Sequence, residues 1–65
     1  MKKNVLILGS GGRECAFAWK ISQDINTNKI YCIPGNAGTQ EYAENFDIPL
    51  DDYKSILNFV LEKNI

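Results

Sequence analysis

The chain of 65 residues contains no histidine and only two cysteines. It therefore lacks the imidazole that most often transfers protons near neutral pH and that most often binds metals. Cys15 and Cys32 are too few and too far apart for a zinc site or a C-x-x-C redox motif, and in a reducing cytosol we expect both to stay thiols. No cluster of carboxylates has the spacing of a metal site. We expect neither a catalytic residue nor a metal ligand within this chain.

The chain also has little net charge and no long apolar run. Seven basic and eight acidic residues nearly cancel, and no basic cluster marks a surface for nucleic acid or an anionic membrane. The apolar run behind the initial Met-Lys-Lys reaches only to Gly9, which is too short for a signal-peptide core or a membrane span. We therefore expect a cytoplasmic protein with neither nucleic acid nor a membrane as a partner.

A glycine-rich loop follows the apolar residues 5–8 directly. It reads Gly9, Ser10, Gly11, Gly12, Arg13 and Glu14. A strand that bends through glycines into a helix points backbone N–H groups outward at the positive end of the helix dipole, where an anion fits. The loop is therefore a candidate phosphate site.

Two common nucleotide-binding patterns can be tested on spacing alone. The P-loop needs a glycine followed by a lysine where this chain has Glu14 and Cys15. The dinucleotide fingerprint fits Gly9 and Gly11, but it needs a small residue at position 14 and an acidic residue about 20 residues further on. The second strand ends instead in residues 33–35, Ile-Pro-Gly. These features argue against a dinucleotide-binding half of an oxidoreductase, although this remains the alternative interpretation of the function.

A second loop with a similar signal follows the apolar residues 30–33. It reads Pro34, Gly35, Asn36, Ala37, Gly38 and Thr39. These residue types permit turns and left-handed backbone. Because parallel strands present their carboxyl ends at one edge of a sheet, where ligands of such folds bind, we expect the two loops to be neighbours.

Periodicity predicts an α/β chain. We expect strands at about 3–8, 29–33 and, weakly, 46–48. Between the first two strands, we expect a helix from about 13 to 24 that turns Phe17 and Trp19 inward. After the second strand, we expect a short helical turn near 39–44. Asp51 or Asp52 is expected to cap a last helix. Its apolar stripe would comprise Tyr53, Ile56, Leu57, Val60 and Leu61.

The strand pattern predicts an open, three-layer, Rossmann-like parallel sheet of order 3-2-1, with further strands missing. Residues 5–8 and 30–33 are continuous apolar runs, as in strands buried on both faces. Right-handed crossovers from strand one to two to three place their connecting helices on a single face. We therefore expect the other face to be open here, to be covered by missing parts of the chain.

Taken together, residues 9–14, Ala16, residues 18–20 and residues 34–39 resemble the amino-terminal domain of glycinamide ribonucleotide synthetase, also called phosphoribosylamine-glycine ligase. The resemblance covers most of the first 40 residues and implies a pre-ATP-grasp fold. One residue departs from the pattern: the family's first loop usually continues Arg-Glu-His, where this chain has Cys15. Any hydrogen bond from that imidazole is missing here.

The resemblance implies a function in de novo purine biosynthesis. There, ATP, glycine and 5-phosphoribosylamine are joined with Mg²⁺ or Mn²⁺, through a glycyl phosphate intermediate, to form glycinamide ribonucleotide. It further implies that the two loops hold the ribose phosphate, whereas ATP and the metal bind to an ATP-grasp domain outside this chain. Members of the family are several times longer. We therefore interpret residues 1–65 as a partial, substrate-side domain that is inactive alone and whose partners are its small-molecule substrates and the remainder of its own chain.

Structural alternatives stand beside these assignments. Ser10 is also a candidate helix cap, Glu14 a charge that favours the helix dipole, and Asn36 a residue that holds its own loop. Arg13 is equally suited to solvent, and Cys15 to simple packing. A non-enzymatic, truncated remnant would carry the same residues, so that interpretation stays open as well.

Overall fold

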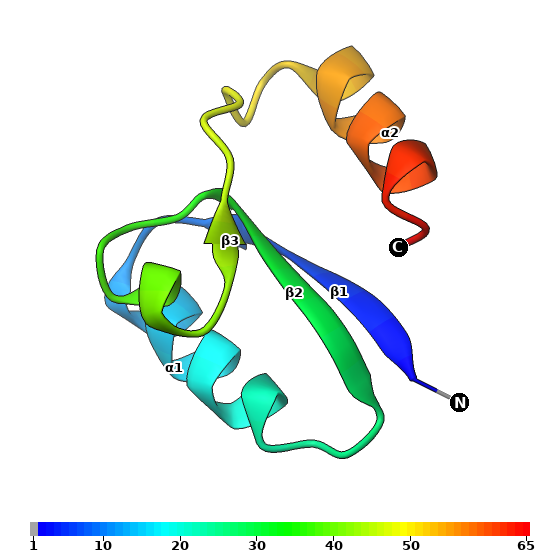
Figure 1. Ribbon diagram of the computed structural model, residues 1–65. Helices are drawn as coiled ribbons and strands as arrows, with labels where there is room; N and C mark the ends of the chain where they lie inside the picture. Colours follow the sequence, from blue (N-terminus) through cyan, green and yellow to red (C-terminus); the bar gives the residue numbers. More distant parts are fainter. Residues whose placement is uncertain (1) are drawn as a thin grey trace.

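The computed structural model describes residues 2–65. Its elements, shown in Figure 1, are β1 (Lys3–Gly9), α1 (Gly12–Ser22), β2 (Thr27–Pro34), the 3₁₀ turn η1 (Thr39–Glu41), β3 (Glu44–Asn45) and α2 (Tyr53–Glu62). The strands form one parallel sheet in the order β1-β2-β3. The predicted fold class, an open parallel α/β sheet with strand order 3-2-1, is therefore confirmed.

A helix packs against each face of the sheet. Side chains of β2 alternate between the faces, as the period of a strand requires. Ile30 and Cys32 pack in a core cluster with Ala18 of α1, whereas Tyr31 and Ile33 pack in a second cluster with Phe59 of α2. The continuous apolar run of β2 therefore has the predicted cause, burial on both sides.

The prediction that one face would be open is wrong over β2, which α2 covers (Figure 1). On the same face, Leu8 of β1 stays 51% exposed. That prediction considered only the helices between successive strands. After β3 the chain turns back across the sheet toward β1, where the Asn4 side chain donates a hydrogen bond to Lys63 O at 2.9 Å. A right-handed return in this opposite direction places its helix on the opposite face.

Helix α2 docks through a cluster of aromatic rings. The Phe59 ring meets Tyr31 edge-on at a centroid distance of 5.3 Å and Phe46 at 4.9 Å. The Lys63 ammonium lies 5.8, 5.6 and 6.0 Å from the ring centroids of Tyr31, Phe46 and Phe59, within the range of a cation–π interaction. This cluster fixes α2 on the sheet.

The predicted apolar stripe of α2 is correct only in part. Of its members, Ile56 and Val60 are half-buried. Tyr53, Leu57 and Leu61 are 77%, 57% and 68% exposed, whereas Phe59, outside the predicted stripe, is buried, so the helix is rotated from the prediction. Apolar residues occupy more than one side of this helix, so the period of 3.6 residues allows more than one stripe. The helix turns its largest apolar side chain, Phe59, toward the other two rings.

The prediction that Phe17 and Trp19 of α1 pack inward is wrong. Phe17 and Trp19 are 55% and 49% exposed, whereas Ala18 between them is fully buried. Successive residues of a helix are rotated by about 100°, so a helix that packs through Ala18 must turn both neighbours sideways. A small residue at the contact lets α1 lie close to Ile7 and Cys32 on the sheet.

The third strand lies two residues earlier than predicted. Its ladder with β2 pairs Tyr31 with Glu44 and Cys32 with Asn45, and it ends where Phe46 enters the aromatic cluster. The predicted cap of α2 is confirmed, since the Asp52 carboxylate accepts hydrogen bonds from the Ser55 N–H at 3.2 Å and hydroxyl at 2.8 Å. No helix within residues 2–65 has the length and apolar character to cross a membrane.

The aromatic cluster predicts unequal effects of two truncations in α2. Phe59→Ala should cost about 3–5 kcal/mol, as for buried Phe in other cores, which is comparable to the total stability of a domain this small. Leu57→Ala, on the exposed side, should change the free energy of unfolding by less than about 0.5 kcal/mol. Urea titrations followed by circular dichroism measure both. A loss at Leu57 as large as that at Phe59 would contradict the observed rotation of α2.

Candidate functional site

The two loops lie side by side at the carboxyl ends of β1 and β2 (Figure 1). Gly9 is paired with Pro34 at the end of the ladder, and the Gly35 N–H donates to Gly9 O at 3.0 Å. The Asn36 amide then donates to two carbonyls of the first loop, Ser10 O at 2.7 Å and Gly11 O at 3.1 Å. The expected proximity of the loops is therefore confirmed.

Helix α1 begins in the first loop, with Gly11 rather than Ser10 as its N-cap. The Cys15 N–H bonds back to Gly11 O at 3.4 Å. Within the part of the chain that the structure describes, the N–H groups of Gly12, Arg13 and Glu14 donate no hydrogen bond. Unused donors at the positive end of a helix dipole form an anion-binding group.

Glu14 holds the first loop in shape. Its carboxylate accepts a hydrogen bond from the Gly11 N–H at 3.0 Å. Gly9 has a φ of +143°, and a Cβ at this position would overlap the same carboxylate. Only glycine meets both conditions. By contrast, a Cβ on Gly12 would meet no atom within 4 Å, so an anion can approach on that side of the helix end.

The second loop is held by its own side chains. Asn36 Oδ1 accepts a hydrogen bond from the Thr39 N–H at 2.9 Å, and the Asn36 N–H donates to Thr39 Oγ1 at 2.8 Å. Thr39 has no exposed surface. Asn36 therefore holds its own loop, as one of the two interpretations of the sequence expected, and in addition ties that loop to the first.

Asn45, the last residue of β3, is a part of the site that the sequence analysis missed. Its Oδ1 accepts from the Thr39 hydroxyl at 2.9 Å, and its Nδ2 donates to Asn36 O at 2.7 Å. Its side chain occupies the space that a Cβ on Gly35 would need, and Gly35 has a φ of +76°. The sequence pattern placed the third strand at about 46–48, with Asn45 before its start, whereas the structure places Asn45 at the carboxyl end of β3, on the edge where both loops begin.

The two cysteines lie beneath and beside the loops. Cys15, in the first turn of α1, contacts the second loop so closely that a Cβ on Gly38 would lie 2.8 Å from its Sγ. Cys32 is fully buried, and its Sγ lies 3.6 Å from Gly9 O. Burial raises the pKa of the Cys32 thiol, and this effect outweighs the hydrogen bond with Thr39, which lowers it. Within residues 2–65, no three or more His, Cys, Asp or Glu side chains form a group that could hold a metal ion.

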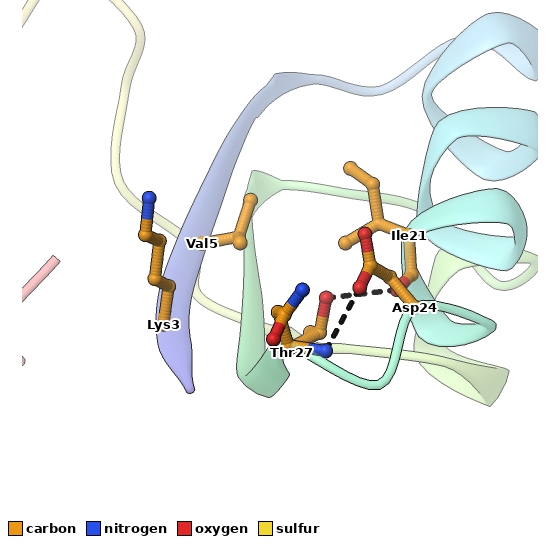
Figure 2. A pocket seen from close by; sticks show the side chains of 6 residues that line it. Lys3, Val5, Ile21, Asp24 and Thr27 are labelled. Atoms are coloured by element: carbon orange, nitrogen blue, oxygen red, sulfur yellow. Dashed lines mark hydrogen bonds between the residues drawn. The ribbon is translucent and has the colours of Figure 1, made fainter. Parts of the chain in front are cut away.

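A hollow at the opposite end of the sheet is separate from the loops. Figure 2 shows Lys3, Val5, Ile21, Asp24 and Thr27 around it. Thr27 uses its polar groups in the turn between α1 and β2: its hydroxyl donates to Ile21 O at 2.9 Å and its N–H to Asp24 O at 3.1 Å. The hollow lies at the amino ends of the strands, away from the edge where open parallel sheets bind ligands.

The sequence comparisons identify the family of this chain. The model of the family "Phosphoribosylglycinamide synthetase, N domain" matches residues 3–65. The chain belongs to this family. The phosphoribosylamine–glycine ligase of Rhodopirellula baltica is 45% identical over 64 residues, which are 98% of this chain and 15% of that protein. The ligase of Brucella melitensis is 46% identical over 61 residues, or 94% of this chain and 14% of that protein.

A third relative gives the same proportions. The ligase of Vibrio vulnificus is 47% identical over 64 residues, which are 95% of this chain and 15% of that protein. The chain thus spans about 15% of the length of the curated relatives that it matches. The resemblance seen in the two loops is confirmed at the level of the family.

The burial of Cys32 predicts a difference in thiol reactivity. At about pH 8, iodoacetamide should modify Cys15 at least about tenfold faster than Cys32. The thiolate is the reactive form, and Cys32 is fully buried and has a raised pKa, so that less thiolate forms and the reagent reaches it less readily. Mass spectrometry of peptides after timed quenching measures both rates. In urea the two rates should converge. Equal rates in the folded chain would contradict the described burial of Cys32.

Proposed function

We propose that this chain is the substrate-side part of a phosphoribosylamine–glycine ligase and that its two loops hold the 5-phosphate of phosphoribosylamine. The observation that supports this most directly is the set of unused N–H groups on Gly12, Arg13 and Glu14, in a chain of this family. A phosphate is an anion with several acceptor oxygens, and such donors at a helix end match it. The Arg13 side chain is exposed beside them and offers a fork suited to phosphate.

In this proposal, the chain binds and orients a substrate and does not carry out the chemistry. The ligase reaction would use ATP with Mg²⁺ or Mn²⁺ to activate glycine as glycyl phosphate, which the substrate's amine then attacks. The described residues offer no group of carboxylates for the metal. We therefore assign ATP and metal binding to an ATP-grasp domain that lies outside these residues. We also propose a cytoplasmic location, as expected for this metabolic function.

The loop residues singled out in the sequence divide into two groups in this proposal. The first set of residues has polar groups free to meet the substrate: Ser10, Gly12, Arg13, Ala37 and Gly38. The second set shapes the loops: Gly9, Gly11, Glu14, Pro34, Gly35, Asn36 and Thr39. Glu14 has both roles, because its carboxylate holds the Gly11 N–H while its own N–H is unused. The division follows their hydrogen bonds. The N–H groups of Ala37 and Gly38, like those of Gly12 and Arg13, donate to no other residue in the described range.

A chimaera tests the proposal against the non-enzymatic interpretation. Residues 2–65 would replace the matched segment of the Rhodopirellula baltica ligase, which is 45% identical. A functional domain should give a chimaera that makes glycinamide ribonucleotide from phosphoribosylamine, glycine and ATP. A chimaera that folds, binds ATP and has no activity would support the remnant interpretation instead.

Within this chimaera, Gly12→Val tests the phosphate site. The valine side chain would fill the open space at the helix end, and it should raise the KM for phosphoribosylamine by at least about tenfold, equivalent to 1.4 kcal/mol of binding free energy. The KM for ATP should change less than about twofold.

Two further variants act as controls for Gly12→Val. Lys20→Val introduces the same side chain at an exposed position of α1 and should leave both KM values unchanged. Gly12→Ala should give an intermediate effect, because its side chain fills less of the space. An unchanged KM for phosphoribosylamine in a folded Gly12→Val chimaera would contradict the assignment of the phosphate to this loop.

A further inference from the structure

We propose that Asn36 and Asn45 are positioning residues, which assemble the phosphate-binding loop before substrate arrives and do not touch the substrate themselves. This inference rests on the proposed function and assigns roles within the same site.

The Asn36 side-chain amide has no N–H donor left for a substrate. A side-chain amide has two N–H donors. Those of Asn36 are directed at Ser10 O and Gly11 O, at 2.7 and 3.1 Å, and its Oδ1 accepts from the Thr39 N–H. What remains on Asn36 is acceptor capacity, which is unfavourable beside a phosphate. Asn36 therefore acts on the substrate through the first loop.

Asn36 also orients the peptide unit between Gly11 and Gly12. In a trans peptide, the carbonyl of one residue and the N–H of the next point to opposite sides. When Asn36 holds the Gly11 carbonyl, it also fixes the direction of the Gly12 N–H. That N–H is one of the unused donors at the start of α1. Asn36 thus aims a phosphate donor that it does not itself contact.

Asn45 in turn holds Asn36 in place. Asn45 donates from Nδ2 to Asn36 O at 2.7 Å and accepts from the buried Thr39 hydroxyl at 2.9 Å. Because Asn45 is part of β3, it joins the second loop to the hydrogen-bonded sheet. Gly35 leaves the space for its side chain. The path of positioning runs from the sheet through Asn45 and Asn36 to the Gly11–Gly12 peptide.

The test combines amide exchange and ligand titration on the 65-residue chain. The variants are Asn36→Ala, Asn45→Ala and the double variant. The matched control is Asn28→Ala, which removes a side-chain hydrogen bond to Asn4 at 3.0 Å at the other end of the same strands. Hydrogen exchange of the Gly35 and Thr39 N–H groups is measured without ligand. Ribose 5-phosphate is then titrated while the amide resonances of Gly12 and Arg13 are followed.

We expect Asn45→Ala to speed exchange at Gly35 and Thr39 by at least about tenfold and to raise the Kd for ribose 5-phosphate by about tenfold. The Asn28→Ala control should change neither. Asn36 and Asn45 act on the same peptide unit, one through the other. The Kd of the double variant for ribose 5-phosphate should therefore be no higher than the higher of the two single-variant Kd values. Three outcomes would overturn the positioning role. They are additive losses of affinity in the double variant, a loss of affinity without faster exchange at Gly35 and Thr39, and faster exchange there with an unchanged Kd.

The proposed function and the positioning role fail in different ways. If ribose 5-phosphate does not shift the Gly12 and Arg13 resonances of the unaltered chain, the phosphate assignment is wrong, whereas unchanged exchange in Asn45→Ala refutes the positioning role. Should a variant of the 65-residue chain fail to fold, the same substitution in the chimaera decides. There, Asn45→Ala should raise the KM for phosphoribosylamine about tenfold and leave the KM for ATP unchanged. Equal effects on both KM values would overturn the positioning role.

Discussion

The hydrogen bond from the Gly35 N–H to Gly9 O closes the parallel ladder at the point where both strands leave the sheet. Everything at the candidate site depends on this closure. It places the starts of the two loops next to each other, so that one short side chain, Asn36, can span the distance between them. Without aligned strand ends, the helix end and the second loop would be separate surface features.

The two glycines of this closure have a common role. Gly9 and Gly35 both have positive φ, and each leaves space that a polar side chain from elsewhere occupies: the Glu14 carboxylate at Gly9 and the Asn45 amide at Gly35. Each of these side chains in turn bonds to the backbone of its own loop region. The glycines therefore allow both the turn of the chain and the approach of the groups that hold the loops rigid.

The sequence predicted those features that depend on local pattern. Continuous apolar runs located β1 and β2, the glycine-rich loops located the candidate site, and the pair Asp51 and Asp52 located the start of α2. The errors concern properties that local pattern does not determine. Phe17, Trp19 and the outer side of α2 are apolar in sequence yet exposed in the structure, because the choice of buried stripe depends on which rings and small residues lie opposite.

Asn45 shows the same limit at the site. Its role depends on contacts with residues six and nine positions earlier, across the turn that brings β3 to the sheet. In the sequence it is one asparagine that directly precedes the weak strand expected at about 46–48. The path of the chain after β3 was missed for a related reason: the face that α2 covers is decided by the direction of the return toward β1, which the strand order alone leaves undetermined.

The charges of the two loops limit what they contribute to substrate binding. Residues 9–14 and 34–39 contain one basic side chain, Arg13, and one acidic side chain, Glu14, so they carry no net charge. The Glu14 carboxylate already occupies the Gly11 N–H. Attraction for a phosphate therefore comes from the remaining N–H groups, from the Arg13 side chain, and from the helix dipole, which contributes about 0.3–1 kcal/mol for an exposed charge. Such a site also sets the direction in which a phosphate binds, because its donors belong to a backbone that Glu14 and Asn36 hold in place.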